Sequence, residues 1–185
     1  EMDLTETGDA IEVGEISYTR SVGDYLTFYV SPAGGGSGSS LFSKACVYDG
    51  QTNALDDCGT LVTGMDLDYG TAFSASVDVG NGIGIAFGYE GESTPDGSEG
   101  LATDEGIDAY AVNLSYIKDN YGFSYTFMVD ENSQSTGAGT EEDPTVPNVL
   151  GAGESEYQSI NAFFTPSIDR FPSISVGFEW ENDNA

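Results

Sequence analysis

Apolar and polar residues alternate along much of this chain, most regularly between Ile107 and Asp130. Aromatic and aliphatic side chains take every second position from Tyr110 to Tyr116, and they do so again from Tyr121 to Val129, after a polar break at Asp119 and Asn120. A period of two is typical of a β-strand with one apolar and one polar face, so this stretch predicts a hairpin. Each strand has about nine or ten residues, which at about 3.3 Å per residue and a tilt of about 45° crosses a hydrocarbon layer.

The same pattern predicts eight strands, joined as four hairpins, in a single domain over residues 1–185. The first expected strand, Ile11 to Arg20, alternates poorly, because Ile11 and Val13 fall on the opposite face from Ile16 and Tyr18. The other expected strands cover about 25–30, 71–79, 83–90, 109–116, 121–130, 159–164 and 173–180.

Short turns alternate with long loops between these strands. Gly80, Asn81 and Gly82 accept the positive φ that a tight hairpin requires, so they predict a turn. The first long loop opens with the Gly- and Ser-rich run from Ala33 to Ser40, which is not expected to form regular structure. Long loops are expected at about 32–69, 91–106 and 131–155.

The composition of the polar face distinguishes two architectures. In a soluble β-sandwich the apolar face packs into the core, and the other face meets water and is rich in Lys, Glu, Arg and Thr. Here the second face is mostly Gly, Ala, Ser and Asn, which is typical of the lumen of a transmembrane barrel whose apolar face contacts lipid. Aromatic residues near the expected strand ends favour the same arrangement, namely Tyr89, Tyr110, Tyr116, Tyr121 and Trp180. The predicted water-facing, pore-lining residues are Ser74, Ser76, Asp78, Glu90, Asn113, Ser115, Ser124, Thr126, Asp130, Asn161 and Glu179.

The charged residues indicate which partners the protein is expected to bind. The chain has 32 acidic residues, 4 basic residues and no histidine, for a net charge of -28, so nucleic acid is not an expected partner and cations are. Arg20, Lys118 and Arg170 lie beside expected short turns, and Lys44 lies in a long loop. Acidic residues gather at the long-loop end, which predicts a negative mouth that attracts cations; alternatively, they only keep the surface solvated. The acidic residues of the second and third long loops and their flanks are Glu90, Glu92, Asp96, Glu99, Asp104, Glu105, Asp108, Asp130, Glu131, Glu141, Glu142, Asp143, Glu154 and Glu156.

The sequence does not indicate catalysis. Without histidine, no Ser/His/Asp or Cys/His arrangement exists, and nothing singles out two acids for a glycosidase pair. No EF-hand spacing appears, and a zinc site would need more ligands than two cysteines. We therefore predict a protein that is not an enzyme and has neither cofactor nor metal site.

Cys46 and Cys58 are the only cysteines, and both lie in the first long loop. We expect them to form a disulfide that closes this loop, which implies an oxidising compartment. The loop from Cys46 to Cys58 is also a candidate for a segment folded into the pore.

Several segments resemble the barrel portion of cyanobacterial outer-membrane porins of the carbohydrate-selective and iron-uptake type: ISYTRSVGDYLTFYVSP, YGTAFSASVDVGNGIGIAFGYEGE, DAYAVNLSYIKDNYGFSYTF and SINAFFTPSIDRFPSISVGFEW. The most specific element is the strand and Pro-containing turn followed by PSISVGFEW. This resemblance implies an antiparallel up-and-down transmembrane β-barrel of roughly sixteen strands, of which this chain holds about eight. It also implies an outer-membrane location, contact with outer-membrane lipid and a homo-oligomer, a trimer, for the full-length protein.

The expected function is a porin: a water-filled channel for passive diffusion of small hydrophilic solutes or ions, leaning towards cations, with sugars and iron also open. Asp78, Asn113 and Glu179 are the positions most expected to tune selectivity. The alternatives are a secreted acidic β-sandwich adhesin, with Phe123, Phe127 and Phe178 buried between two sheets, and a calcium-dependent carbohydrate-binding module.

Overall fold

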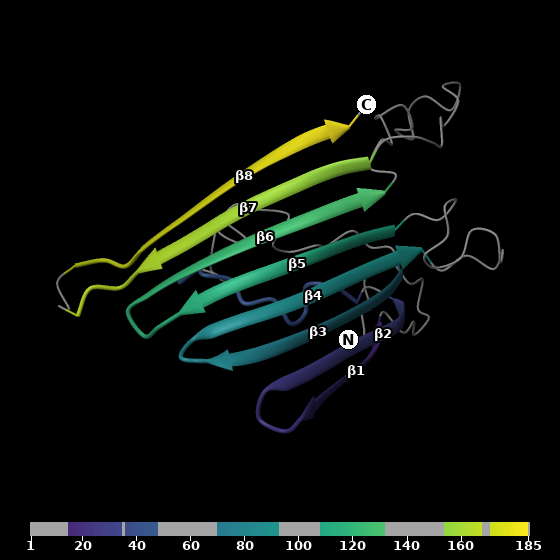
Figure 1. Cartoon of the computed structure of the whole chain (residues 1–185), viewed down its shortest axis with the longest axis horizontal. Coiled ribbons are helices and arrows are strands. Elements are labelled where there is room, and N and C mark those ends of the chain that lie inside the picture. Colours follow the sequence, from purple (N-terminus) through teal and green to yellow (C-terminus); the bar gives the residue numbers. More distant parts are fainter. Residues whose placement is uncertain are drawn as a thin grey trace, which may run out of the picture.

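The fold is given by a computed structural model that describes residues 15–34, 36–47, 70–92, 108–131, 154–167 and 171–184. These residues form strands, turns and an extended segment (Figure 1), and none of them forms a helix that is long and apolar enough to cross a membrane. The strands are β1 (Glu15–Val22), β2 (Leu26–Gly34), β3 (Gly70–Gly80), β4 (Ile83–Glu92), β5 (Asp108–Ile117), β6 (Tyr121–Glu131), β7 (Glu154–Phe164) and β8 (Ile174–Asn184).

The eight strands form one antiparallel sheet in which each strand pairs with the next strand of the chain. Figure 1 shows them side by side in a single twisted layer, with β1 and β8 at opposite edges. The predicted all-β, antiparallel up-and-down architecture is confirmed to this extent, as an open sheet.

β1 covers Glu15–Val22, two residues beyond the predicted end at Arg20, and Ile11 and Val13, where the alternation is poor, lie outside the described residues. The pairing of β1 with β2 contains one irregularity. Ile16 pairs with Ala33, but Tyr18 pairs with Val30, so β2 holds one extra residue beside Pro32. Proline has no N–H to donate to a ladder, and bulges and edges are where strands tolerate it. The loop predicted from about residue 32 begins three residues later, because β2 continues to Gly34.

Two strands are also longer than the alternation predicted. β7 begins at Glu154 rather than near Ser159, and β8 continues to Asn184 rather than ending at Trp180. Glu154 pairs with Asn184 across the two strands. Apart from Tyr157, the added positions are acidic or polar on both faces, so no apolar alternation marks them as strand in the sequence.

The tight turn between β3 and β4 has the predicted conformation. Gly80, Asn81 and Gly82 have φ values of 91°, 56° and 83°. A side chain on Gly82 would also collide with the neighbouring strand, since a Cβ there would lie 2.2 Å from the Ile117 carbonyl oxygen. Glycine at this position therefore serves both the turn and the approach of β5.

One face of the sheet, which we call the outer face, is apolar and largely exposed. Its central row crosses all eight strands in register and contains no polar side chain apart from a tyrosine hydroxyl; Leu114 in this row is 45% exposed and Phe178 is 66% exposed. The row is Val22, Leu26, Val77, Ile85, Leu114, Tyr125, Ile160 and Phe178.

The opposite face, which we call the inner face, is small and polar, and much of it is buried. The buried apolar cluster of the described residues is limited to Ala109, Ala111 and Met128, with Phe42 and Tyr157 packed against it. Most large apolar side chains thus point outward, and most inner ones are small, the reverse of an ordinary soluble sheet.

Candidate functional site

The predicted pore-lining residues share the inner face. Asn113 pairs with Thr126, Ser115 pairs with Ser124, and Ser124 pairs in turn with Asn161, so these hydroxyl and amide groups form continuous cross-strand rows. Ser76 and Glu179 are half-buried, and Asp78 is exposed. The buried members of the predicted set are Ser74, Glu90, Asn113, Ser115, Ser124, Thr126, Asp130 and Asn161.

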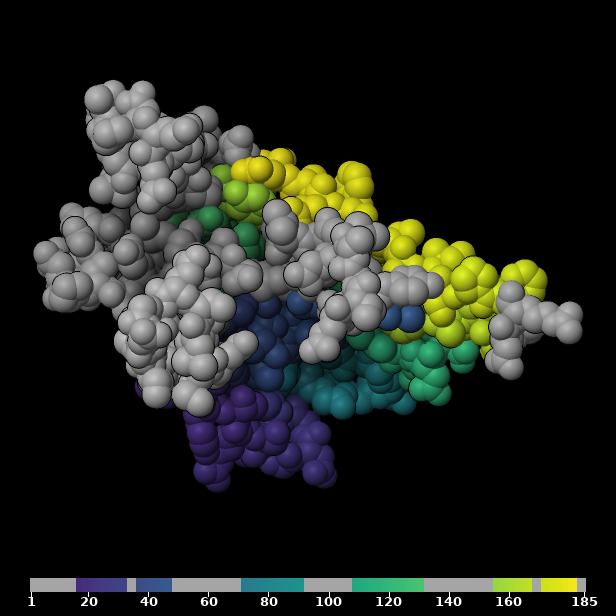
Figure 2. Space-filling view, turned by 180° about the vertical axis from the view of Figure 1, so that it is seen from behind, coloured from purple at the N-terminus to yellow at the C-terminus, as the bar shows by residue number. Residues whose placement is uncertain are grey.

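Part of this burial comes from residues 36–47, which we call the crossing segment because they lie over the inner face. Figure 2 views the molecule from behind and shows the segment, in blue, over the teal and green strands. Backbone N–H groups of the segment donate to side chains of four different strands. The donors and acceptors are Gly38 to Glu90 Oε1 on β4 (2.6 Å), Ser43 to Asn113 Oδ1 on β5 (3.0 Å), Ala45 to Ser124 Oγ on β6 (3.0 Å) and Val47 to Ser175 Oγ on β8 (3.0 Å).

These bonds explain why the inner face has acceptors where it does. The segment 36–47 has no strand partner for these N–H groups. The bonds of the Gly38 and Ala45 N–H groups are buried, and a buried N–H without an acceptor costs about 1–3 kcal/mol. Two hydrogen bonds orient the amide side chain of Asn113: its Nδ2 donates to Thr126 Oγ1 at 3.0 Å, and its Oδ1 accepts from the Ser43 N–H. Glu90 is only 1% exposed, and the N–H of Gly38 satisfies one of its oxygens.

Glycines allow the crossing segment to lie at backbone distance from the sheet. A Cβ on Gly88 would be 2.3 Å from the Gly38 carbonyl oxygen, and a Cβ on Gly36 would be 2.2 Å from Ser31 Cβ. Neither position has room for any side chain without a shift of backbone or of a buried serine. The small residues of this face are therefore required by contact with the segment as well as by the strand pattern.

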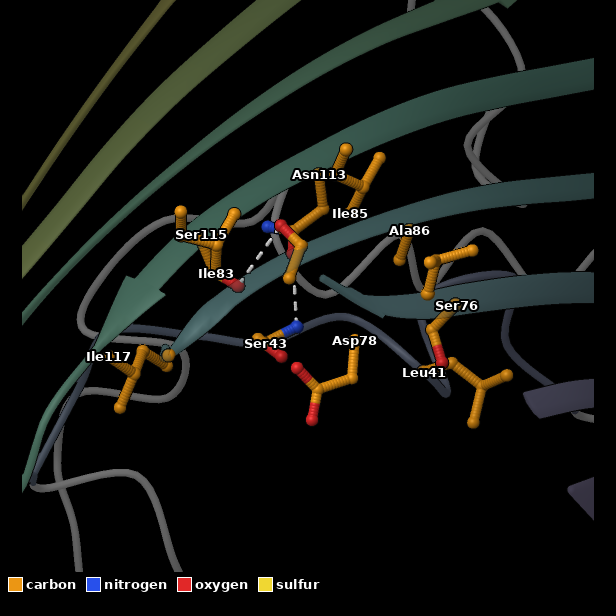
Figure 3. A pocket seen from close by; sticks show the side chains of 13 residues that line it. Leu41, Ser43, Ser76, Asp78, Ile83, Ile85, Ala86, Asn113, Ser115 and Ile117 are labelled. Atoms are coloured by element: carbon orange, nitrogen blue, oxygen red, sulfur yellow. Dashed lines mark hydrogen bonds between the residues drawn. The ribbon is translucent and has the colours of Figure 1, made fainter. Parts of the chain in front are cut away.

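A cavity of about 220 Å³ lies between the crossing segment and the turn-side half of β3, β4 and β5. Figure 3 shows the Ser43 backbone joined to Asn113 by a hydrogen bond, with Asp78, Ser76 and Leu41 also lining the space. Its polar lining combines hydroxyls, one amide and one carboxylate, which suits water or a small hydrophilic solute. Four predicted pore-lining residues meet here, namely Ser76, Asp78, Asn113 and Ser115.

The three positions expected to tune selectivity lie in different surroundings. Asp78 is at the turn, where its Oδ1 accepts from the Gly80 N–H at 2.8 Å. Asn113 holds the crossing segment, as described above. Glu179 lies on β8, opposite Ser159 of β7. The structure thus brings Asp78 and Asn113 to one cavity and does not bring Glu179 to it.

One buried hydroxyl is unusual among the described residues. Ser74 Oγ has no hydrogen-bond partner, although the residue is fully buried between Tyr29 of β2 and Gly88 of β4. The described structure offers no reason for this unpaired hydroxyl.

Charges lie at the two ends of the sheet as the sequence indicated, so far as the residues are described. Arg20 and Lys118 lie near the turns, and the Lys118 ammonium sits 5.5 Å from the ring centre of Tyr116. Glu90, Asp108, Asp130, Glu131 and Glu154 lie at the loop ends of β4 to β7. Arg170, Asp96, Glu99, Asp104, Glu105, Glu141, Glu142 and Asp143 lie outside the described residues.

The structure describes only one of the two cysteines of the predicted disulfide. Cys46 belongs to the crossing segment, and its sulfur is not a free thiol. Cys58 lies outside the described residues, so the Cys46–Cys58 disulfide stays a prediction. Within the part of the chain that the structure describes, no group of three or more Cys, Asp or Glu side chains is placed to hold a metal ion.

Sequence reasoning missed the partners of the inner face. The amides of Gly38, Ser43, Ala45 and Val47 carry no side-chain signature, and Ser175 was not among the predicted lining residues. One sequence signal for the crossing segment was Gly88, because a glycine inside a strand can mark the close approach of another backbone, and alanine or serine would have fitted the alternation equally well.

The described residues thus define a class: an all-β chain whose eight antiparallel strands form one open up-and-down sheet. Comparisons with protein family models, with curated proteins and with solved structures found no match.

Proposed function

We propose that this chain forms part of the wall of a water-filled channel in an outer membrane, through which small hydrophilic solutes or ions diffuse passively. The sheet would close with further strands into a transmembrane barrel of roughly sixteen strands, to which this chain contributes about half. The outer face would meet lipid, and the inner face would line the passage.

The observation that carries this proposal is the inverted polarity of the sheet. The central outer row is apolar across eight strands, and Leu114 and Phe178 in it remain 45% and 66% exposed. A soluble monomer rarely exposes a continuous apolar patch of more than a few hundred Å², and when it does the patch marks a partner or a membrane. Lipid fits this face best, because the central outer row is apolar across all eight strands and offers no polar groups to a protein partner other than one tyrosine hydroxyl.

The path of the apolar band across the strands also supports a membrane setting. In β1 and β2 the turn-side end of the band is Val22 and Leu26, which belong to the central outer row. In β7 and β8 the turn-side end is Phe164 and Ile174, four residues beyond the central outer row on the turn side. At the loop side, Glu156 of β7 lies in the same row as Tyr110 of β5. The band therefore runs obliquely to the rows of paired residues.

Strand tilt accounts for this obliquity. Neighbouring strands lie about 4.8 Å apart and residues rise about 3.3 Å, so a tilt of 35–45° shifts a level line by about 1.0–1.5 residues per strand. The observed shift is four residues over the five steps from β2 to β7 and never reverses, which corresponds to a tilt of about 30°, somewhat below that range. A flat lipid slab crossing tilted strands produces a band of this kind, and the core of a sandwich has no reason to.

Acidic residues at the loop ends favour cations in such a channel. Glu90, Asp108, Asp130, Glu131 and Glu154 all lie at that end of the sheet. Carboxylates around a mouth raise the local concentration of cations, and salt weakens the effect because the Debye length is about 10 Å at 0.1 M.

The β-sandwich adhesin is less favoured by the same side chains. It requires Phe123 and Phe178 to be covered by a second sheet, but they are 46% and 66% exposed, and the described strands all belong to one sheet. Phe127 is half-buried. A calcium-dependent module has no observation in its favour among the described residues.

The test is conductance of the full-length protein in planar lipid bilayers, compared with the same protein carrying Asp78→Asn and Glu179→Gln. We expect discrete, ohmic channel openings and a zero-current potential that favours cations, with a weaker preference in the variant. Absence of conductance from folded, membrane-inserted protein would contradict the proposal.

A further inference from the structure

The crossing segment follows one level of the proposed barrel between its second and last anchors. Relative to the central outer row, Asn113 on β5 lies one residue towards the loops, Ser124 on β6 one residue towards the turns, and Ser175 on β8 three residues towards the turns. The anchors thus descend four residues over three strands. This is the slope of a line of constant height when strands tilt by about 40°, and its direction matches that of the apolar band.

The level in question is the middle of the apolar band. Asn113 lies midway between Tyr110 and Tyr116, the aromatic residues near the two ends of β5. On β6 the apolar positions run from Tyr121 to Val129, so their middle is Tyr125, the neighbour of Ser124. Since Ser43 is held to Asn113 and Ala45 to Ser124, the backbone between them crosses the inner face near the half-height of the proposed lipid layer.

Lys44 is the residue between these two anchored positions. Among the basic residues that the structure describes, it is the one on the inner side of the sheet: Arg20 pairs with Phe28 in an outer row, and Lys118 lies over the Tyr116 ring. Lys44 is half-buried and interacts with neighbouring groups of the protein. Its positive charge contributes to the potential at this level whichever group it contacts, because pairing offsets a charge without removing it.

We propose that Lys44 is a specificity-determining residue of the channel, which places a positive charge at the mid-height narrowing and limits the cation preference set by the acidic loop ends. This inference rests on the proposed channel function. Ions crossing the passage would meet a negative mouth first and a cationic segment afterwards, so overall selectivity would be the balance of the two fields.

The test measures the zero-current potential of the full-length protein in a potassium chloride gradient, for the wild type and for Lys44→Gln, Lys44→Glu and Lys44→Arg. A unit charge about 7 Å from a permeating ion in a water-like medium changes each ion's concentration about threefold, in opposite directions for cation and anion. Screening at 0.1 M salt, where the Debye length is about 10 Å, roughly halves this energy, so we expect Lys44→Gln to raise the potassium-to-chloride permeability ratio by about threefold. Lys44→Glu should raise it further, and Lys44→Arg should keep the wild-type ratio.

Lys118→Gln is the matched control, because it removes the same charge near a turn, where the ammonium lies against an aromatic ring. It should leave the ratio unchanged. A conducting Lys44→Gln channel with the wild-type ratio, or an equal change in Lys44→Arg, would overturn the assignment of Lys44 while leaving the channel itself in place. A wild-type protein that does not conduct would overturn the channel, and the inference with it.

Discussion

The two faces of the sheet are built from alternate residues of the same strands, yet they follow opposite rules. On β5, Leu114 points outward and is 45% exposed, while its neighbours Asn113 and Ser115 point inward and are 1% and 7% exposed. The inner residues are buried under a crossing segment that they hold by hydrogen bonds, whereas nothing in the described structure covers the outer ones. The comparison teaches that apolarity does not mark the packed side of this protein. Polar contacts organise the inner face.

The largest expected effect comes from placing a charge on the outer face. Leu114→Arg puts a guanidinium in the middle of the apolar band, and in a bilayer this should lower the free energy of unfolding by about 2–4 kcal/mol. Urea titration of the protein refolded into lipid vesicles measures the change. The control is Asp119→Arg, at an exposed position of the β5–β6 turn, where the same side chain should cost little. If Leu114→Arg changed stability by less than about 0.5 kcal/mol, as an ordinary surface substitution does, the outer face would be in contact with water.

A smaller effect is expected where the crossing segment touches the sheet. Gly88→Val would bring a Cβ to within 2.3 Å of the Gly38 carbonyl oxygen, so the segment must move away, at a cost of about 1–3 kcal/mol. The matched control is Gly177→Val, on the same face but exposed, where a β-branched residue suits a strand. Unfolding in urea measures both. Equal stability of the two variants would mean that the segment does not rest on Gly88.

The smallest of these effects concerns a single anchor. Asn113→Ala leaves the Ser43 N–H without its acceptor and Thr126 Oγ1 without its donor, which should cost about 1–2 kcal/mol. Asn113→Asp keeps the oxygen that Ser43 uses, so it should retain protection of the Ser43 amide against hydrogen exchange, while Asn113→Ala should lose it. Unchanged protection in Asn113→Ala would show that the anchor does not hold the segment.

Much of the fold follows from the period-two pattern, and the reason is visible in particular rows. Leu114, Tyr125 and Ile160 are in register because each strand repeats the same alternation and each short turn preserves it. The added ends of β7 and β8 were missed because Glu154 and Asn184 are polar on either face and carry no marker. The site was predicted as a set of small lining residues, but its organisation was not. Backbone amides such as those of Ser43 and Ala45 do the binding, and an N–H group looks the same at every position of a sequence.

The most direct test of the account uses the single tryptophan of the chain, Trp180. It lies on the outer face, in the row of Val112 and Phe127. In vesicles containing brominated lipid, its fluorescence should be strongly quenched, and aqueous acrylamide, a neutral quencher, should have little effect. Moving the indole one residue, with Glu179→Trp in a Trp180→Phe background, puts it on the inner face and should reverse both results. Quenching of Trp180 by acrylamide but not by brominated lipid would contradict the claim that the apolar face of this sheet meets the membrane.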